Sequence, residues 1–278
     1  MVCGAPGHAI RLRRFHTDMP IERLQHALQQ YKQTQERGAS PRGTVVHGPS
    51  SLPVPLVYTQ TRTVIPSVSA MAAHRLITAT QSGTFLEAYK ILRAQILSRL
   101  EENDWNVIGV TSPGCTEGKT LVAANLAISI AMDPNHTALL VDANLQAPKV
   151  HQLFDLENTG LADFLLDHGV LSALLVHPHI DRLVVLPGGG PLQHSVEALT
   201  LPKMKALLEE MKHRYASRIV VVDLPPLLNR ADVLALAPML DAVVLVVEAG
   251  RTTGNDIGKS LSLLQGVPIL GTVLNKAK

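Results

Sequence analysis

The sequence predicts an α/β fold: a mostly parallel sheet with helices on both faces, preceded by a flexible N-terminal leader. Three observations carry this prediction. Aliphatic runs of strand length alternate with helical patterns, hydrophobic residues make up 46% of the chain against 17% charged residues, and aromatic residues are only 3%. Strands that are covered on both faces are continuously aliphatic rather than alternating. The composition therefore suits a buried parallel sheet.

The leader is expected to span residues 1–75 and to hold one helix, near 20–35. Apolar residues at helical spacing mark that helix, which either docks on a partner or packs on its own domain. Gly, Ser and Pro are frequent from 38 to 55, which is typical of a flexible segment. Residues 76–278 are expected to form the folded domain.

The folded domain is expected to begin with an amphipathic helix over 84–100. Short aliphatic runs then alternate with helix-length connections. Such alternation indicates parallel strands joined by right-handed crossovers. The expected strands are 106–111, 138–142, 183–187, 219–223, 242–247 and 269–274.

Composition also excludes several classes of protein. Cys3 and Cys115 are far apart and in no metal-ligand spacing, so neither a disulfide framework nor a zinc site is expected. A net charge of +2 and few aromatics argue against a nucleic-acid partner. There is no apolar run of about 18 residues and no secretory signal. We therefore expect a soluble cytoplasmic protein without a membrane span of its own.

The junction between the expected strand at 107–111 and the helix after it carries the strongest motif. Gly118, Lys119 and Thr120 stand where a phosphate loop supplies a turn, a cation for the outer phosphates and a hydroxyl for magnesium. The first glycine of the motif falls on Pro113, with Gly114 one place late. The alternative is an ordinary turn between a strand and a helix. The expected nucleotide-binding residues here are Gly114, Cys115, Thr116, Glu117, Gly118, Lys119, Thr120 and Leu121.

Two further strands end in an aspartate, Asp142 and Asp223. Ligands of open α/β sheets bind at the carboxyl ends of the strands, so both carboxylates are expected beside the loop. Magnesium prefers oxygen ligands and keeps several waters, so one carboxylate is expected to bind it, directly or through water, while the other orients the attacking group. An aspartate in this position can also simply cap the next helix.

From about Tyr58 to Lys276 the chain resembles the bacterial tyrosine kinases (BY-kinases) of capsule and exopolysaccharide synthesis, within the wider P-loop group of partitioning ATPases. The motifs that carry the resemblance are an E-x-x-K-x-x-R helix at 87–93, the phosphate loop at 112–120, a second Walker motif at 141–151 and a Walker B motif at 222–226. The resemblance implies a P-loop NTPase-like fold, ATP and Mg²⁺ as cofactors, and a role for Asn275 at the adenine edge. By position it also implies Lys119, Asp142 and Asp223 as catalytic residues, and Thr120, Asp142 and Asp223 as the residues around the metal. It also implies a homo-oligomer whose subunits meet through Glu87, Lys90 and Arg93.

The chain departs from that family at the second Walker motif. Asn144 and Gln146 replace the second acid and the arginine of the usual D-x-D-x-R, which removes one negative and one positive charge. We expect this change to weaken catalysis.

The tyrosines also depart from the family pattern, in which a C-terminal tyrosine cluster accepts phosphate. No tyrosine follows Tyr215 in this sequence. Tyr31 and Tyr58, in the leader, remain as candidate acceptors, whereas Tyr89 lies on the expected helix and is interpreted as structural.

The leading functional hypothesis is an ATP-dependent, tyrosine-kinase-like regulator of exopolysaccharide or capsule biosynthesis or export. A separate membrane co-polymerase or chain-length regulator would recruit it to the inner face of the plasma membrane. The alternative is an ATP-binding switch or scaffold with little phosphotransfer in the same pathway. A partitioning-type ATPase is a third hypothesis, disfavoured because Gly114 stands where that group carries an additional lysine.

Overall fold

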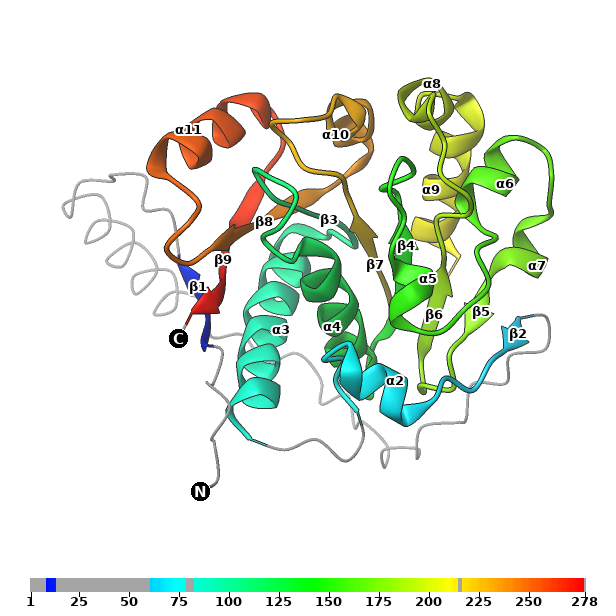
Figure 1. Ribbon diagram of the computed structural model, residues 1–278, viewed down its shortest axis with the longest axis horizontal. Coiled ribbons are helices and arrows are strands. Elements are labelled where there is room, and N and C mark those ends of the chain that lie inside the picture. Colours follow the sequence, from blue (N-terminus) through cyan, green and yellow to red (C-terminus); the bar gives the residue numbers. More distant parts are fainter. Residues whose placement is uncertain (1–8, 14–60, 79–82, 215–216, 278) are drawn as a thin grey trace, which may run out of the picture. The chain divides into compact units, whose positions relative to one another are not determined.

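A computed structural model describes residues 9–13, 61–78, 83–214 and 217–277 (Figure 1). One compact unit comprises residues 1–13 and 56–278, and all the described residues belong to it. The second unit, 14–55, contains the predicted helix at 20–35 and Tyr31 and lies outside the described residues. Tyr58 and Tyr215 also lie outside them.

The described strands form one sheet in the order β1-β9-β8-β3-β7-β4-β6-β5-β2. The six strands from β9 to β6 are parallel to their neighbours, and the pairs β1·β9 and β5·β6 are antiparallel. The strands are β1 (Ala9–Arg13), β2 (Arg62–Thr63), β3 (Val107–Thr111), β4 (Thr137–Asp142), β5 (Val176–His177), β6 (Leu183–Leu186), β7 (Arg218–Asp223), β8 (Ala242–Glu248) and β9 (Ile269–Ala277).

Helices cover both faces of the sheet, with α3 and α4 side by side on one face and α9 on the other (Figure 1). No helix in the described ranges is both long and apolar enough to span a membrane. The helices are α2 (Val68–Ala73), α3 (Thr84–Asn103), α4 (Lys119–Ala131), α5 (Val150–Leu153), α6 (Leu161–Leu165), α7 (Leu171–Leu174), α8 (Ser195–Leu199), α9 (Pro202–His213), α10 (Asp232–Leu236), a 3₁₀ turn (Ala237–Met239) and α11 (Gly254–Leu263).

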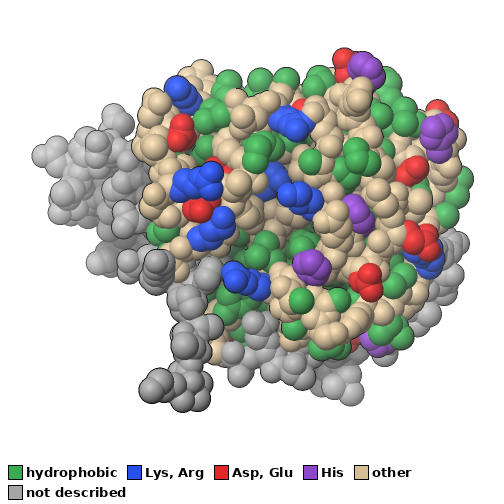
Figure 2. Space-filling model, in the orientation of Figure 1, with side chains coloured by type: hydrophobic (Ala, Val, Ile, Leu, Met, Phe, Trp, Pro, Cys, Tyr) green, Lys and Arg blue, Asp and Glu red, His purple; other side chains and the backbone are tan. Residues whose placement is uncertain are grey.

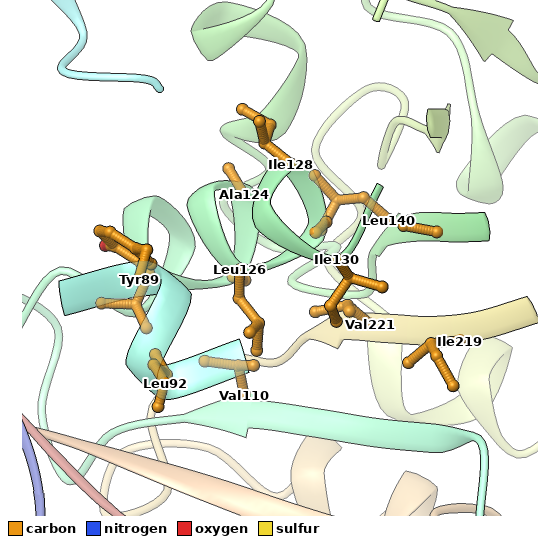
Figure 3. Close-up of a cluster of buried hydrophobic side chains, with 14 of the residues drawn as sticks. Tyr89, Leu92, Val110, Ala124, Leu126, Ile128, Ile130, Leu140, Ile219 and Val221 are labelled. Atoms are coloured by element: carbon orange, nitrogen blue, oxygen red, sulfur yellow. The ribbon is translucent and has the colours of Figure 1, made fainter. Parts of the chain in front are cut away.

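Alternate residues of each central strand enter two separate cores, because successive side chains point to opposite faces of a sheet. On β7, Val221 packs in the core under α3 and α4, whereas Val220 and Val222 pack in the core under α6, α8, α9 and α10. Figure 3 shows Val221 and Ile219 beside Ile130 of α4. Every residue of α4 except Leu121 is buried, so this helix is apolar on nearly all sides.

The structure confirms the predicted fold class, and β3, β4, β6, β7, β8 and β9 confirm the six predicted strands. The predicted helix over 84–100 continues to Asn103 as α3. Three elements inside the predicted leader, β1, β2 and α2, belong to the compact unit. Strands as short as β2 and β5 carry no periodicity that a sequence pattern could reveal.

The carboxyl ends of the parallel strands meet at one edge of the sheet. Asp142 at the end of β4 is the register partner of Asp223 at the end of β7. Glu248 at the end of β8 is likewise the partner of Asn275 on β9. This edge therefore collects four polar residues around the end of β3.

Candidate functional site

Residues 112–118, here called the P-loop, join β3 to α4 at this edge. Ser112 Oγ donates to Gly114 O at 2.7 Å, and the Gly114 N–H donates to Glu117 Oε1 at 2.7 Å. Gly118 precedes α4 with φ 86°, and an added Cβ would lie 2.5 Å from Asn275 Nδ2. Glycine is therefore required at 118 for two reasons: its φ is positive, and the Asn275 side chain of β9 leaves no room for a Cβ.

Lys119 is the first residue of α4, and it turns its ammonium into the site instead of towards solvent. Its exposed fraction is 5%. Nζ donates to Thr120 Oγ1 at 3.3 Å and lies 4.0 Å from Asp223 Oδ1. A buried ammonium requires a compensating charge, and Asp223 supplies one.

Asp142 organises the chain after β4. Its Oδ1 accepts the N–H of Asn144 at 3.1 Å, and its Oδ2 accepts the N–H groups of Lys149 and Val150, both at 2.9 Å. Burial and the nearby Asp223 raise the pKa of Asp142 to about 7, against the lowering effect of the three N–H donors. The backbone bonds orient this carboxylate firmly.

Asp223 contrasts with Asp142, because both of its oxygens are buried and accept no hydrogen bond in the described part of the chain. Burial raises the pKa of Asp223, and the positive charges of Lys119 and Lys149 and the Thr120 hydroxyl act in the opposite direction. A carboxylate in this state has the unfilled coordination capacity that a magnesium ion requires.

The donor set around Asp223 fits magnesium better than a metal held by protein ligands alone. No group of three or more His, Cys, Asp or Glu side chains in the described ranges is arranged to hold a metal. Magnesium typically takes one or two carboxylates, a hydroxyl, substrate phosphates and water. Thr120, which is 8% exposed, can supply the hydroxyl, and Asp223 can supply a carboxylate.

A second group of residues forms the outer wall of the P-loop, and the sequence analysis missed two of them. Asn275 Nδ2 donates to Glu117 O at 2.7 Å, so the predicted adenine-edge residue contacts the P-loop directly. Lys276 Nζ donates to Thr116 O at 2.7 Å and lies 3.2 Å from Glu248 Oε2. The position of Glu248 at a strand end, like that of Asp142, is the signal that could have identified it.

The two residues that depart from the family pattern have partners inside the protein. Asn144 Nδ2 donates to Ala147 O at 2.9 Å. Gln146 Nε2 donates to Ser195 Oγ at 2.8 Å, and Ser195 Oγ in turn donates to Asp232 Oδ1. Gln146 therefore joins the segment after β4 to α8 and α10.

The three residues predicted for oligomerisation divide into two groups. Glu87 and Lys90 form an exposed ion pair of 2.7 Å on α3. Arg93 Nη1 instead donates to Ser129 O of α4 at 2.7 Å. Tyr89, on the same helix, is 1% exposed and packs in the core with Leu92 (Figure 3), as its structural interpretation predicted.

The surface around this edge is mixed in charge. Figure 2 shows Lys and Arg side chains gathered, among a few Asp and Glu, on the part of this face that holds α3, α4 and α11. Such a surface favours the approach of a polyanionic ligand without forming one large basic field.

The curated relatives of the chain include tyrosine-protein kinases and a polysaccharide biosynthesis transport protein. The chain is 32% identical over 195 residues to "Tyrosine-protein kinase YwqD" of Bacillus subtilis, covering 69% of this chain and 81% of that one. It is 31% identical to "Succinoglycan biosynthesis transport protein ExoP" of Rhizobium meliloti over 73% of this chain, and 29% identical to "Tyrosine-protein kinase etk" of Escherichia coli over 68%. It spans 26% of the length of each of these two. No family model matches the chain.

Solved structures agree with this result. The kinase domain of Escherichia coli tyrosine kinase ETK superposes with a TM-score of 0.66 at 26% identity, covering 80% of this chain and 92% of that one. The chimerical protein CapA2B2 gives 0.68 at 25% identity, covering 78% and 93%. MinD of Pyrococcus horikoshii, complexed with Mg-ADP, gives 0.51 at 22% identity over 60% and 68%, a likeness of fold alone.

Proposed function

The chain belongs to the bacterial tyrosine-protein kinase family, and from this premise we propose that it binds ATP with Mg²⁺ at the P-loop and transfers the γ-phosphate to a tyrosine hydroxyl. The observation that carries the proposal is the buried Lys119 ammonium between Thr120 and an Asp223 carboxylate that lacks hydrogen bonds. A magnesium nucleotide would supply both the cation that this carboxylate lacks and the phosphates that the lysine contacts.

Each residue has a separate part in this proposal. The P-loop N–H groups and Lys119 orient the phosphates, and Thr120 and Asp223 hold the ion. Asp142 keeps residues 144–150 in place through its three hydrogen bonds from backbone N–H groups. Because its pKa lies near neutrality, Asp142 also acts with Asp223 in accepting the proton of the acceptor hydroxyl. Asn275 sets the distance between β9 and the P-loop, next to the proposed adenine edge.

Transfer of label from γ-³²P-ATP to the purified protein tests the proposal directly. Wild type with Mg²⁺ is expected to acquire label on tyrosine, and Lys119→Ala is expected to acquire none. Label on tyrosine that persists in Lys119→Ala would contradict the proposed site. Because Lys203 is remote in sequence and pairs with Asp167 on the surface, Lys203→Ala is the matched control.

A second candidate function is an ATP-dependent switch or scaffold with little phosphotransfer. The internal hydrogen bonds of Asn144 and Gln146 favour it, because those side chains are engaged with Ala147 and Ser195. ATP-dependent assembly should then survive when all four tyrosines, Tyr31, Tyr58, Tyr89 and Tyr215, are changed to Phe. Loss of assembly in that variant would favour the kinase.

The biological setting is part of the same proposal. We infer a role in exopolysaccharide or capsule biosynthesis or export, through a membrane co-polymerase that recruits the protein to the inner face of the plasma membrane. The kinship with ExoP, whose name gives it a part in succinoglycan biosynthesis transport, supports this setting. Deletion of the protein should reduce polymer output, and Lys119→Ala should fail to restore it.

The proposed homo-oligomer uses the exposed side of α3. Glu87 and Lys90 are 60% and 39% exposed at their side chains, so they are available to a neighbouring subunit. Arg93 already binds Ser129 O and would act by fixing α3 on α4. Sedimentation of Glu87→Ala/Lys90→Ala at several concentrations tests this arrangement, with Glu209→Ala/Lys205→Ala as the surface control.

A further inference from the structure

The ends of β8 and β9 hold the outer side of the P-loop through a group of four residues, here called the loop latch. The latch consists of Thr116, Glu248, Asn275 and Lys276. Lys276 Nζ donates to Thr116 O at 2.7 Å and lies 3.2 Å from Glu248 Oε2. Thr116 Oγ1 donates to Glu248 Oε2 at 3.3 Å, and Asn275 Nδ2 donates to Glu117 O at 2.7 Å. Two carbonyls and one hydroxyl of the P-loop are thus bound from the neighbouring strands.

The backbone of Lys276 has an unusual conformation for this contact. Its φ is 57°, in the left-handed region that lysine rarely adopts. A conformation of this kind persists only where surrounding interactions outweigh its strain, which is of order 1–3 kcal/mol. Asn275 is still paired with Glu248 in the parallel register. Lys276 follows it within β9, where the pairing with β1 shifts register, and from there its side chain reaches Thr116.

Charge gives the latch a second property. Glu248 is 14% exposed at its side chain and contacts Thr116, so a carboxylate lies directly beside a loop proposed to hold polyphosphate. A like charge at this place weakens the binding of an anion, and the weak screening of a partly buried group increases the effect. Lys276 is the cation that pairs with Glu248 in the described residues.

We propose that Lys276 is a positioning residue for the nucleotide: it fixes the Thr116 side of the P-loop and neutralises Glu248, so that the loop accepts a polyphosphate. This inference rests on the proposed function, since it assumes that the P-loop is the nucleotide site. Lys276 acts on the ligand through Thr116 and Glu248, and no phosphotransfer is needed to observe its effect.

Binding of fluorescent ADP and ATP to the full chain with Mg²⁺ is the first measurement. Lys276→Met should lower affinity about tenfold, the effect of losing one charged hydrogen bond and its ion pair. Glu248→Gln should bind nucleotide with close to wild-type affinity, and Glu248→Gln/Lys276→Met should recover part of the affinity that Lys276→Met loses. Lys259→Met, which removes an exposed lysine from α11, should leave affinity unchanged.

Lys276→Gly separates positioning from a general effect on folding. Glycine relieves the strain at φ 57°, so this variant should unfold at the same or a higher temperature, yet it should bind nucleotide as weakly as Lys276→Met. Affinity equal to wild type in both variants would overturn the proposal. A double variant as weak as Lys276→Met alone would overturn the neutralisation of Glu248.

Amide hydrogen exchange of residues 114–118 without nucleotide is the second measurement, and it does not depend on the proposed function. Faster exchange in Lys276→Met than in wild type is expected, and equal exchange would overturn the positioning role. If wild type and Lys119→Ala both bind no nucleotide while exchange still rises in Lys276→Met, the proposed function fails and the latch stands.

Discussion

Asp142 and Asp223 are register partners on adjacent parallel strands, and burial together with the negative charge of Asp223 raises the pKa of Asp142 to about 7. Two buried carboxylates on paired strand positions resist simultaneous ionisation. The pair therefore prefers to hold a proton when no other cation is present, and a bound metal ion would replace that proton.

The affinity for magnesium nucleotide should increase with pH. A cation bound at Asp223 favours the ionised form of neighbouring Asp142, and a pKa of about 7 leaves Asp142 largely protonated at pH 6. Affinity should therefore rise about tenfold from pH 6 to pH 8. Below its pKa, the ionised fraction of Asp142 changes about tenfold for each pH unit, and above its pKa it changes little. In Asp142→Asn, affinity should change with pH only through the titration of the nucleotide itself. An equal change of affinity with pH in wild type and Asp142→Asn would contradict the expectation.

Asp223→Asn should abolish magnesium binding and reduce the dependence of stability on pH. The pKa of Asp223 is raised in the folded state, so the unfolded chain releases this proton first and the free energy of unfolding falls as pH rises above the ordinary aspartate range. Asparagine removes that fall, but it also removes the charge that compensates the buried Lys119 ammonium. The difference in free energy of unfolding between the variant and wild type should therefore shift by about 1 kcal/mol in favour of the variant from pH 4 to pH 8. Thermal melting at both pH values measures this shift, and a shift in favour of wild type would refute it.

Lys119→Met should abolish nucleotide binding and also lower stability. It removes the cation 4.0 Å from Asp223 and leaves that buried carboxylate uncompensated. The destabilisation should be about 3 kcal/mol, and it should be smaller in Lys119→Met/Asp223→Asn. Urea unfolding of the four proteins measures this coupling, and additive effects of the two substitutions would show that the residues act independently.

Gly118→Ala should destroy the site, whereas Gly258→Ala should be harmless. A Cβ at 118 would require φ 86° from alanine and would lie 2.5 Å from Asn275 Nδ2. Gly258 lies inside α11 with nothing within 4 Å of an added Cβ, so alanine should stabilise that helix by up to about 1 kcal/mol. Nucleotide titration and thermal melting distinguish the two, and normal binding by Gly118→Ala would contradict the geometry.

Ser195→Ala should cost about 1–3 kcal/mol of stability, because it leaves buried Asp232 and the Gln146 amide without their shared partner. Ser262→Ala, on the exposed side of α11, is the control and should change stability by less than about 0.5 kcal/mol. Equal urea midpoints for the two variants would mean that the Ser195 network contributes nothing.

The sequence predicted the parts of the fold and site that local patterns specify. Runs such as 219–222 are aliphatic because both of their faces are buried, and Lys119 follows a recognisable loop. Glu248 and Lys276 were missed because their roles depend on β9 lying beside β8 and on one left-handed residue. The acceptor of Arg93, a carbonyl on α4, likewise depends on how two helices pack.

The burial of α4 constrains how this protein can diverge. Lys119 and Thr120 lie at the start of a helix in which Leu121 alone is partly exposed, so nearly every substitution between 119 and 131 changes the core as well as the site. Sequence drift in this helix is therefore limited by folding before it is limited by chemistry. New substrate preferences would have to arise from the exposed loops at the sheet edge, which can change without repacking the interior.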